Sequence, residues 1–105
     1  MACGLTIEGF IMAFEVVEFC EPAPQPGQPF AGTSETLLGE YQDEKIAIDA
    51  ARTRWREMRV ADTADVMWWI VRVPGESRAR WVADRSSNEE QILDLTTMEM
   101  VRVVD

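Results

Sequence analysis

The clearest pattern of apolar and polar positions lies in residues 44–59 (EKIAIDAARTRWREMR). The apolar positions recur at intervals of three and four residues: Ile48, Ala51, Trp55 and Met58. This spacing places them on one stripe of an α-helix. Asp43 stands just before the segment, where a carboxylate can accept hydrogen bonds from the first free amides. The pattern predicts a helix over 44–59 whose small alanines allow close approach to a sheet.

Short stretches rich in β-branched and aromatic residues predict strands on both sides of this helix. They are residues 13–20, 36–41, 66–73, 78–84, 92–95 and 100–104. Residues 66–73 (VMWWIVRV) are apolar on both faces, which is typical of a central strand. Residues 87–90 (SNEE) resemble a capping box and predict a single helical turn. The expected order is β, proline-rich loop, β, α, β, β, β, β, which predicts an α+β fold with one main helix on a mostly antiparallel sheet.

Two segments stand apart from this pattern, within what we expect to be a single domain over residues 1–105. Residues 21–32 hold four prolines, which predicts an extended connector. A docking segment for an aromatic-lined groove is the alternative interpretation of that connector. Residues 1–11 show no clear period and are expected to form a flexible leader or a loosely attached strand.

The adjacent tryptophans Trp68 and Trp69 must point to opposite sides of a strand. If residues 66–73 and 78–84 pair across Pro74-Gly75 through a loop of even length, Trp68 and Trp81 share one face. We expect that face to be the core. The other face is then a candidate binding surface in which tryptophan lies beside arginine, and its residues are Met67, Trp69, Val71, Arg78, Arg80 and Val82. Two alternatives remain: a loop of odd length reverses the faces, or another segment covers Trp69.

The formal net charge of −9 argues against nucleic acid or an anionic membrane as the partner. The acidity is concentrated in residues 1–44, which contain eight acidic residues and no lysine or arginine. Residues 45–105 contain eleven acids and ten bases. An acidic N-terminal third of this kind could also occupy a basic site, as an inhibitor or a nucleic-acid mimic does.

Few residues in the sequence suggest catalysis. The chain has no histidine and only two cysteines, Cys3 and Cys20, so histidine-dependent catalysis and Cys/His zinc sites are not expected. No phosphate-binding, nucleophile-elbow or metalloprotease motif is present. We therefore predict no catalytic, cofactor-binding or metal-binding residue. The first residues do not resemble a signal peptide and no apolar run is long enough to span a membrane, so a cytoplasmic location is expected.

These observations predict a small, acidic, non-enzymatic interaction module that binds another protein or a second copy of itself through an exposed sheet face. The alternative is the acidic inhibitor or mimic. The third interpretation is a small enzyme with carboxylate chemistry.

Overall fold

The computed structural model describes residues 13–27 and 32–103. The expected leader at residues 1–11 lies outside them, as does part of the connector at residues 21–32. The elements are β1 (Phe14–Glu21), β2 (Ser34–Tyr41), α2 (Glu44–Arg59), β3 (Val66–Arg72), β4 (Trp81–Asp84), β5 (Glu90–Asp94) and β6 (Glu99–Arg102). The strands form one antiparallel sheet in the order β2-β1-β3-β4-β5-β6.

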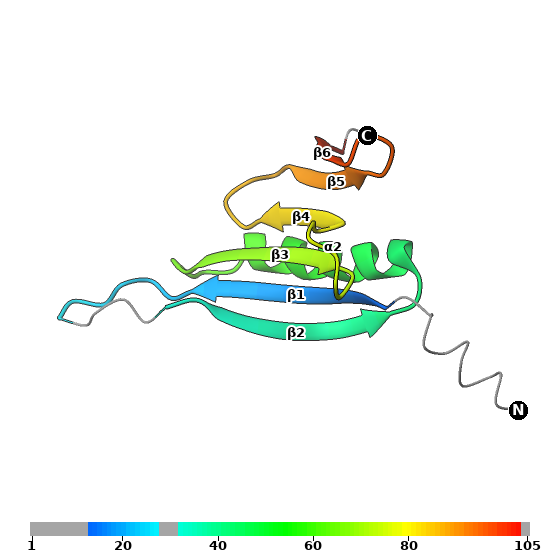
Figure 1. The fold of residues 1–105 in the computed structure, drawn as a ribbon. Coiled ribbons are helices and arrows are strands. Elements are labelled where there is room, and N and C mark those ends of the chain that lie inside the picture. The colour runs from blue at the N-terminus through cyan, green and yellow to red at the C-terminus, as the bar shows by residue number, and fades with distance from the viewer. Residues whose placement is uncertain (1–12, 28–31, 104–105) are drawn as a thin grey trace, which may run out of the picture.

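One helix packs on this sheet, and the predicted α+β class and element order are confirmed. Helix α2 contacts β1, β2, β3 and β4 from one side (Figure 1). No helix or strand in the described part of the chain lies over the other side of these strands. The two sides of the sheet are called the covered face and the open face below.

The helix has the predicted bounds, and its ends show why. The Asp43 carboxylate accepts a hydrogen bond from the Ile46 amide at 3.1 Å. At the other end the Arg85 guanidinium donates to the carbonyl oxygens of Met58 and Ala61, both at 2.7 Å. These contacts satisfy backbone groups that a helix terminus otherwise leaves without partners. Arg85 comes from the end of β4, so it also ties the helix to the sheet.

The core lies between α2 and the covered face. Ala47, Ile48, Ala51 and Trp55 are its helical members, as the periodicity predicted. The sheet contributes Phe14, Val16, Met67, Trp69, Val71, Val73, Trp81 and Ala83. The Trp55 and Trp81 rings meet edge to face with their centroids 6.0 Å apart, a favoured aromatic geometry. The two alanines allow the helix to sit close to this aromatic layer.

The strands begin or end one to three residues from their predicted bounds, and two segments show the clearest differences. Residues 87–90 form no helical turn, and Glu90 already begins β5. The β3–β4 connection does contain the predicted turn, with Gly75 at a φ of 91° and the Glu76 amide donating to the Val73 carbonyl. However, β4 begins only at Trp81. In the described residues no helix is long and apolar enough to cross a membrane.

Candidate interaction surface

The structure corrects the predicted assignment of the two faces. Trp69 and Val71 have 0% exposure and Met67 is also buried, all three on the covered face beneath α2. Trp81 is core as predicted, but it shares its face with Trp69 and not with Trp68. Trp68, predicted as core, lies on the open face.

The reversal follows from the length of the β3–β4 loop. Val71 pairs with Trp81 and Trp69 with Ala83, so an odd number of residues lies between paired positions. With an even number of residues in the loop, odd-numbered residues of β3 would pair with even-numbered residues of β4. A change of one residue in this pairing moves every side chain of a strand to the other face. The loop therefore selects the odd-length alternative.

The predicted binding residues are separated by this arrangement. Arg80 is buried, and it donates to Glu76 at 2.8 Å and to Glu44 at 3.0 Å while its guanidinium lies 5.7 Å from the Phe14 ring. Arg78 is exposed in the β3–β4 loop. Val82 alone of the predicted set lies on the open face, where it pairs with Ile70 and is half-buried. The structure does not bring the six residues together.

Two half-buried carboxylates connect the helix to the tryptophans of the covered face. Glu18 accepts hydrogen bonds from Trp69 Nε1 at 2.9 Å and from Arg54 Nε at 2.7 Å. Glu90 of β5 accepts from Trp81 Nε1 and Arg52 Nε, both at 2.8 Å. Each carboxylate thus connects a tryptophan indole on the covered face of the sheet to an arginine of α2.

The protonation of these two carboxylates reflects their partners. Burial acts to raise the pKa of Glu18, but the hydrogen bonds from Arg54 and Trp69 outweigh it and the pKa is lowered. Burial also acts to raise the pKa of Glu90. The hydrogen bonds from Arg52 and Trp81 outweigh this effect, and the pKa of Glu90 is lowered. Both groups therefore stay ionised at neutral pH and act as hydrogen-bond acceptors, as charge-assisted contacts of this kind favour.

Cys20 shows no sign of activation as a nucleophile. Burial, with the nearby Asp65 carboxylate, raises the pKa of its thiol. Its Sγ lies 3.7 Å from Asp65 Oδ2. A reactive cysteine requires the opposite, an electropositive surrounding that stabilises the thiolate. Among the described residues no group of three or more histidine, cysteine or carboxylate side chains could hold a metal ion.

The open face is defined by strand pairing, because residues that pair directly across antiparallel strands point to the same side. Trp68 pairs with Phe19 of β1, and Ile70 pairs with Val17 of β1 and Val82 of β4. The apolar side chains of the open face are Val17, Phe19, Leu37, Val66, Trp68, Ile70, Val82, Leu93 and Met100. Leu37 and Val66 are more than half exposed, at 51% and 56%, whereas Val17 and Leu93 are buried.

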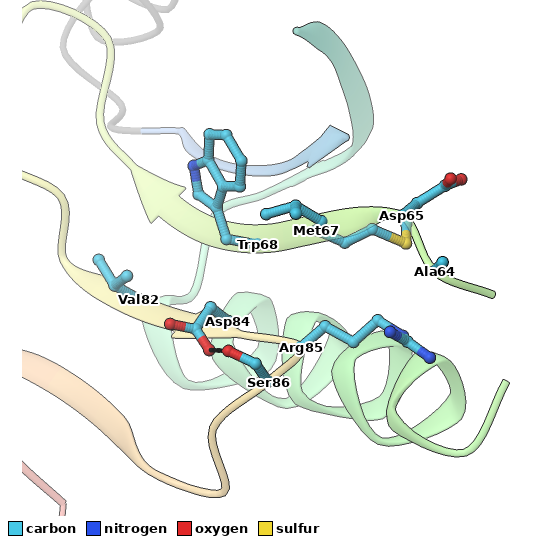
Figure 2. Close-up of a pocket in the computed structure, with 9 residues that line it drawn as sticks. Ala64, Asp65, Met67, Trp68, Val82, Asp84, Arg85 and Ser86 are labelled. Atoms are coloured by element: carbon cyan, nitrogen blue, oxygen red, sulfur yellow. Dashed lines mark hydrogen bonds between the residues drawn. The ribbon is translucent and has the colours of Figure 1, made fainter. Parts of the chain in front are cut away.

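An aromatic stack and a hollow form the most distinctive part of this face. The Trp68 and Phe19 rings lie 5.2 Å apart at 8°, in a stacked arrangement. Beside Trp68 is a hollow of about 450 Å³ whose lining comes from β3, β4 and the adjoining loops and consists of Ala64, Asp65, Val66, Met67, Trp68, Val82, Asp84, Arg85 and Ser86. Figure 2 shows Trp68 and Val82 projecting from the same side of the sheet, away from the helix.

Carboxylates surround the apolar centre. Arg72 donates to Glu15 at 2.9 Å and to Glu35 at 3.0 Å across three strands. By strand pairing the charged residues on the open face are the acids Glu15, Glu21, Glu35, Glu40 and Asp84 and the bases Arg72 and Arg102. Five acids against two bases leave a formal charge of −3.

The acidic N-terminal third is partly neutralised by arginines. Of its eight acids, Glu15 and Glu35 pair with Arg72, Glu18 pairs with Arg54, and Glu44 pairs with Arg80. Two of these acids thus pair within the sheet, and the other two help to hold the helix against the sheet. This observation gives the inhibitor or mimic interpretation less support than the sequence alone gave it.

Comparison of the chain with protein-family models, with curated proteins and with solved structures gave no match in any of the three. The residues and their geometry are therefore the only basis for proposing a function.

Proposed function

We propose that this protein is a non-enzymatic interaction module that binds another protein chain through the open face. The observation that supports this proposal is the asymmetry of coverage. One side of the sheet is sealed by α2, whereas the side that carries the Trp68–Phe19 stack is not covered by any described element. Exposed apolar side chains gathered on one face mark interaction sites, and Leu37 and Val66 of the open face are more than half exposed.

The residue types on the open face also suit recognition. Tryptophan is enriched among the residues that dominate binding energy, because it combines a large contact area with few rotatable bonds. Trp68 is held in place by its stack on Phe19, so little side-chain entropy remains to be lost on binding. The hollow beside it can admit a protruding side chain.

The proposal is tested with two matched pairs of substitutions. Leu37→Ser with Val66→Ser removes exposed apolar groups from the open face. Ile46→Ser with Val60→Ser removes comparably exposed groups, 55% and 86%, from the helix and its end. Each full-length variant and the wild type are recovered from the native host, and the bound proteins are quantified by mass spectrometry.

We expect at least one protein to accompany the wild type and the Ile46/Val60 variant but to be lost from the Leu37/Val66 variant. Cooperative unfolding of both variants shows that each remains folded. Equal recovery of every protein by the two variants would contradict the proposal.

A further inference from the structure

We propose that the partner of the open face is a basic amphipathic segment of another protein, with apolar side chains that contact Trp68 and its neighbours and lysine or arginine side chains that meet the surrounding carboxylates. This inference rests on the proposed interaction function and specifies the chemistry of the partner. It follows from the charge of the open face, the lining of the hollow and the cost of bringing two such faces together.

The charges of the open face are arranged around an apolar centre. Glu40 and Glu21 lie on the β2 and β1 side, and Asp84 lies on the β4 side of Trp68. In the described part of the chain none of these three has a basic partner within ion-pair distance. A partner with lysine or arginine on both sides of an apolar stripe would satisfy all three.

The hollow beside Trp68 favours a cationic side chain in particular. It is lined by Trp68 and other residues of β3, β4 and their adjoining loops and by none of β1, whereas the Trp68 ring stacks on Phe19 of β1. Asp84 is exposed at this hollow, where its Oδ1 accepts from the Ser86 hydroxyl at 3.0 Å. An indole face opposite a carboxylate suits a lysine or arginine, which binds through cation–π and ionic contacts together.

The same charges disfavour two other occupants. A second copy of the chain would bring two faces of formal charge −3 together, within molecules of net charge −9. Like charges at close range across an interface oppose association. Nucleic acid would meet the same repulsion from its phosphates.

The test uses two synthetic amphipathic peptides with leucines at the same helical spacing, one with lysine and the other with glutamate at all remaining positions. Each labelled peptide is titrated with the full-length protein at low salt, and binding is measured by fluorescence anisotropy. We expect the lysine peptide to bind and the glutamate peptide not to bind. The Leu37→Ser/Val66→Ser variant should lose binding of the lysine peptide.

Two further variants separate local charge from total charge. Glu21→Gln with Glu40→Gln removes two carboxylates from the open face. Asp62→Asn with Glu99→Gln removes the same charge from the loop after α2 and from the other side of the sheet. The Glu21/Glu40 variant should bind the lysine peptide roughly fivefold to tenfold more weakly, from two exposed ionic contacts. The control should stay within about twofold of the wild type.

Equal weakening by both charge variants, or equal affinity for the two peptides, would overturn the basic partner. So would the absence of any binding of the lysine peptide. Loss of binding in the Leu37/Val66 variant would still support the open face as an interaction surface in the equal-affinity case. A wild-type dimer by light scattering that becomes a monomer in that variant would instead identify a second copy as the occupant and overturn the inference.

Discussion

The two faces of the sheet are built from alternate residues of the same strands, yet they surround their tryptophan side chains differently. On the covered face, Trp69 and Trp81 are fully buried and their indole N–H groups donate to Glu18 and Glu90. On the open face, Trp68 is only partly buried, and it is packed by a neighbouring phenylalanine. A buried indole needs an acceptor, whereas an indole near solvent needs only a surface on which to lie.

The comparison shows how charge serves each face. On the covered face Glu18 and Glu90 each pair with an arginine of α2, so these two carboxylates stabilise the fold. On the open face Glu21, Glu40 and Asp84 have no such partner among the described residues. The helix thus neutralises Glu18 and Glu90 on the covered face, whereas the open face has carboxylates that can pair with the basic groups of a partner.

The largest expected contrast is between the tryptophans of the two faces. Trp81→Ala should lower the free energy of unfolding by about 3–5 kcal/mol, the range for emptying a buried aromatic site. Trp68→Ala should lower it by about 1 kcal/mol, because it removes a partly exposed ring and one aromatic stack. Urea unfolding followed by circular dichroism measures both. Losses of equal size would show that the open face is as deeply buried as the covered one.

The next contrast concerns the carboxylates. Glu90→Ala should lower the free energy of unfolding by about 2 kcal/mol, because the buried Trp81 N–H loses its acceptor and Arg52 loses its partner. Glu40→Ala, on the open face, should change it by less than about 0.5 kcal/mol, as surface substitutions do. The same unfolding measurement compares the two variants. A Glu40 effect as large as that of Glu90 would contradict the assignment of their roles.

A pH titration of stability tests the same carboxylates. The pKa values of Glu18 and Glu90 are lowered from the ordinary value of 4.5, so the folded state binds fewer protons than the unfolded state. Their contribution to stability is complete above pH 4.5 and is lost as the pH falls through the folded-state values. The double variant Glu18→Gln/Glu90→Gln should therefore show a flatter decline in acid than the wild type. A parallel decline would mean that other groups cause the loss.

The smallest effect is expected for removal of residues 1–11. The described residues already form a helix-covered core, so the shortened chain should unfold cooperatively with a circular dichroism spectrum close to that of the full chain. Loss of cooperative unfolding would show instead that the segment is an integral part of the sheet.

The fold could largely be predicted from the sequence because its strongest signals are local. The helical spacing of Ile48, Ala51 and Trp55 and the Asp43 cap are contained within a few turns of chain, and both were confirmed. The order of the elements along the chain also followed from short apolar stretches. The helical turn predicted at residues 87–90 was wrong, because a capping-box pattern alone does not stabilise a helical turn against pairing of Glu90 with β4.

The assignment of residues to the covered and open faces could not be predicted in the same way, because it depends on whether the β3–β4 loop has an odd or an even number of residues. Pro74-Gly75 indicated a turn, but not that β4 would start at Trp81. Glu18 gave a further misleading signal, since a carboxylate in β1 resembles a solvent-facing position. In fact it lies on the covered face, paired with Trp69. The alternation of Val17 and Phe19 with Glu18 shows only that the two apolar residues lie on the face opposite to Glu18, and it does not show which of the two faces the helix covers.

The most direct test of the face assignment compares two adjacent residues of β3. Ile70 lies on the open face and Val71, with 0% exposure, on the covered face. The free energy of unfolding is measured for Ile70→Lys and for Val71→Lys under the same conditions. Ile70→Lys should remain folded with cooperative unfolding, since its ammonium group reaches water. Val71→Lys should be largely unfolded, since a buried charge without a partner is strongly destabilising. A folded Val71→Lys together with an unfolded Ile70→Lys would contradict the account.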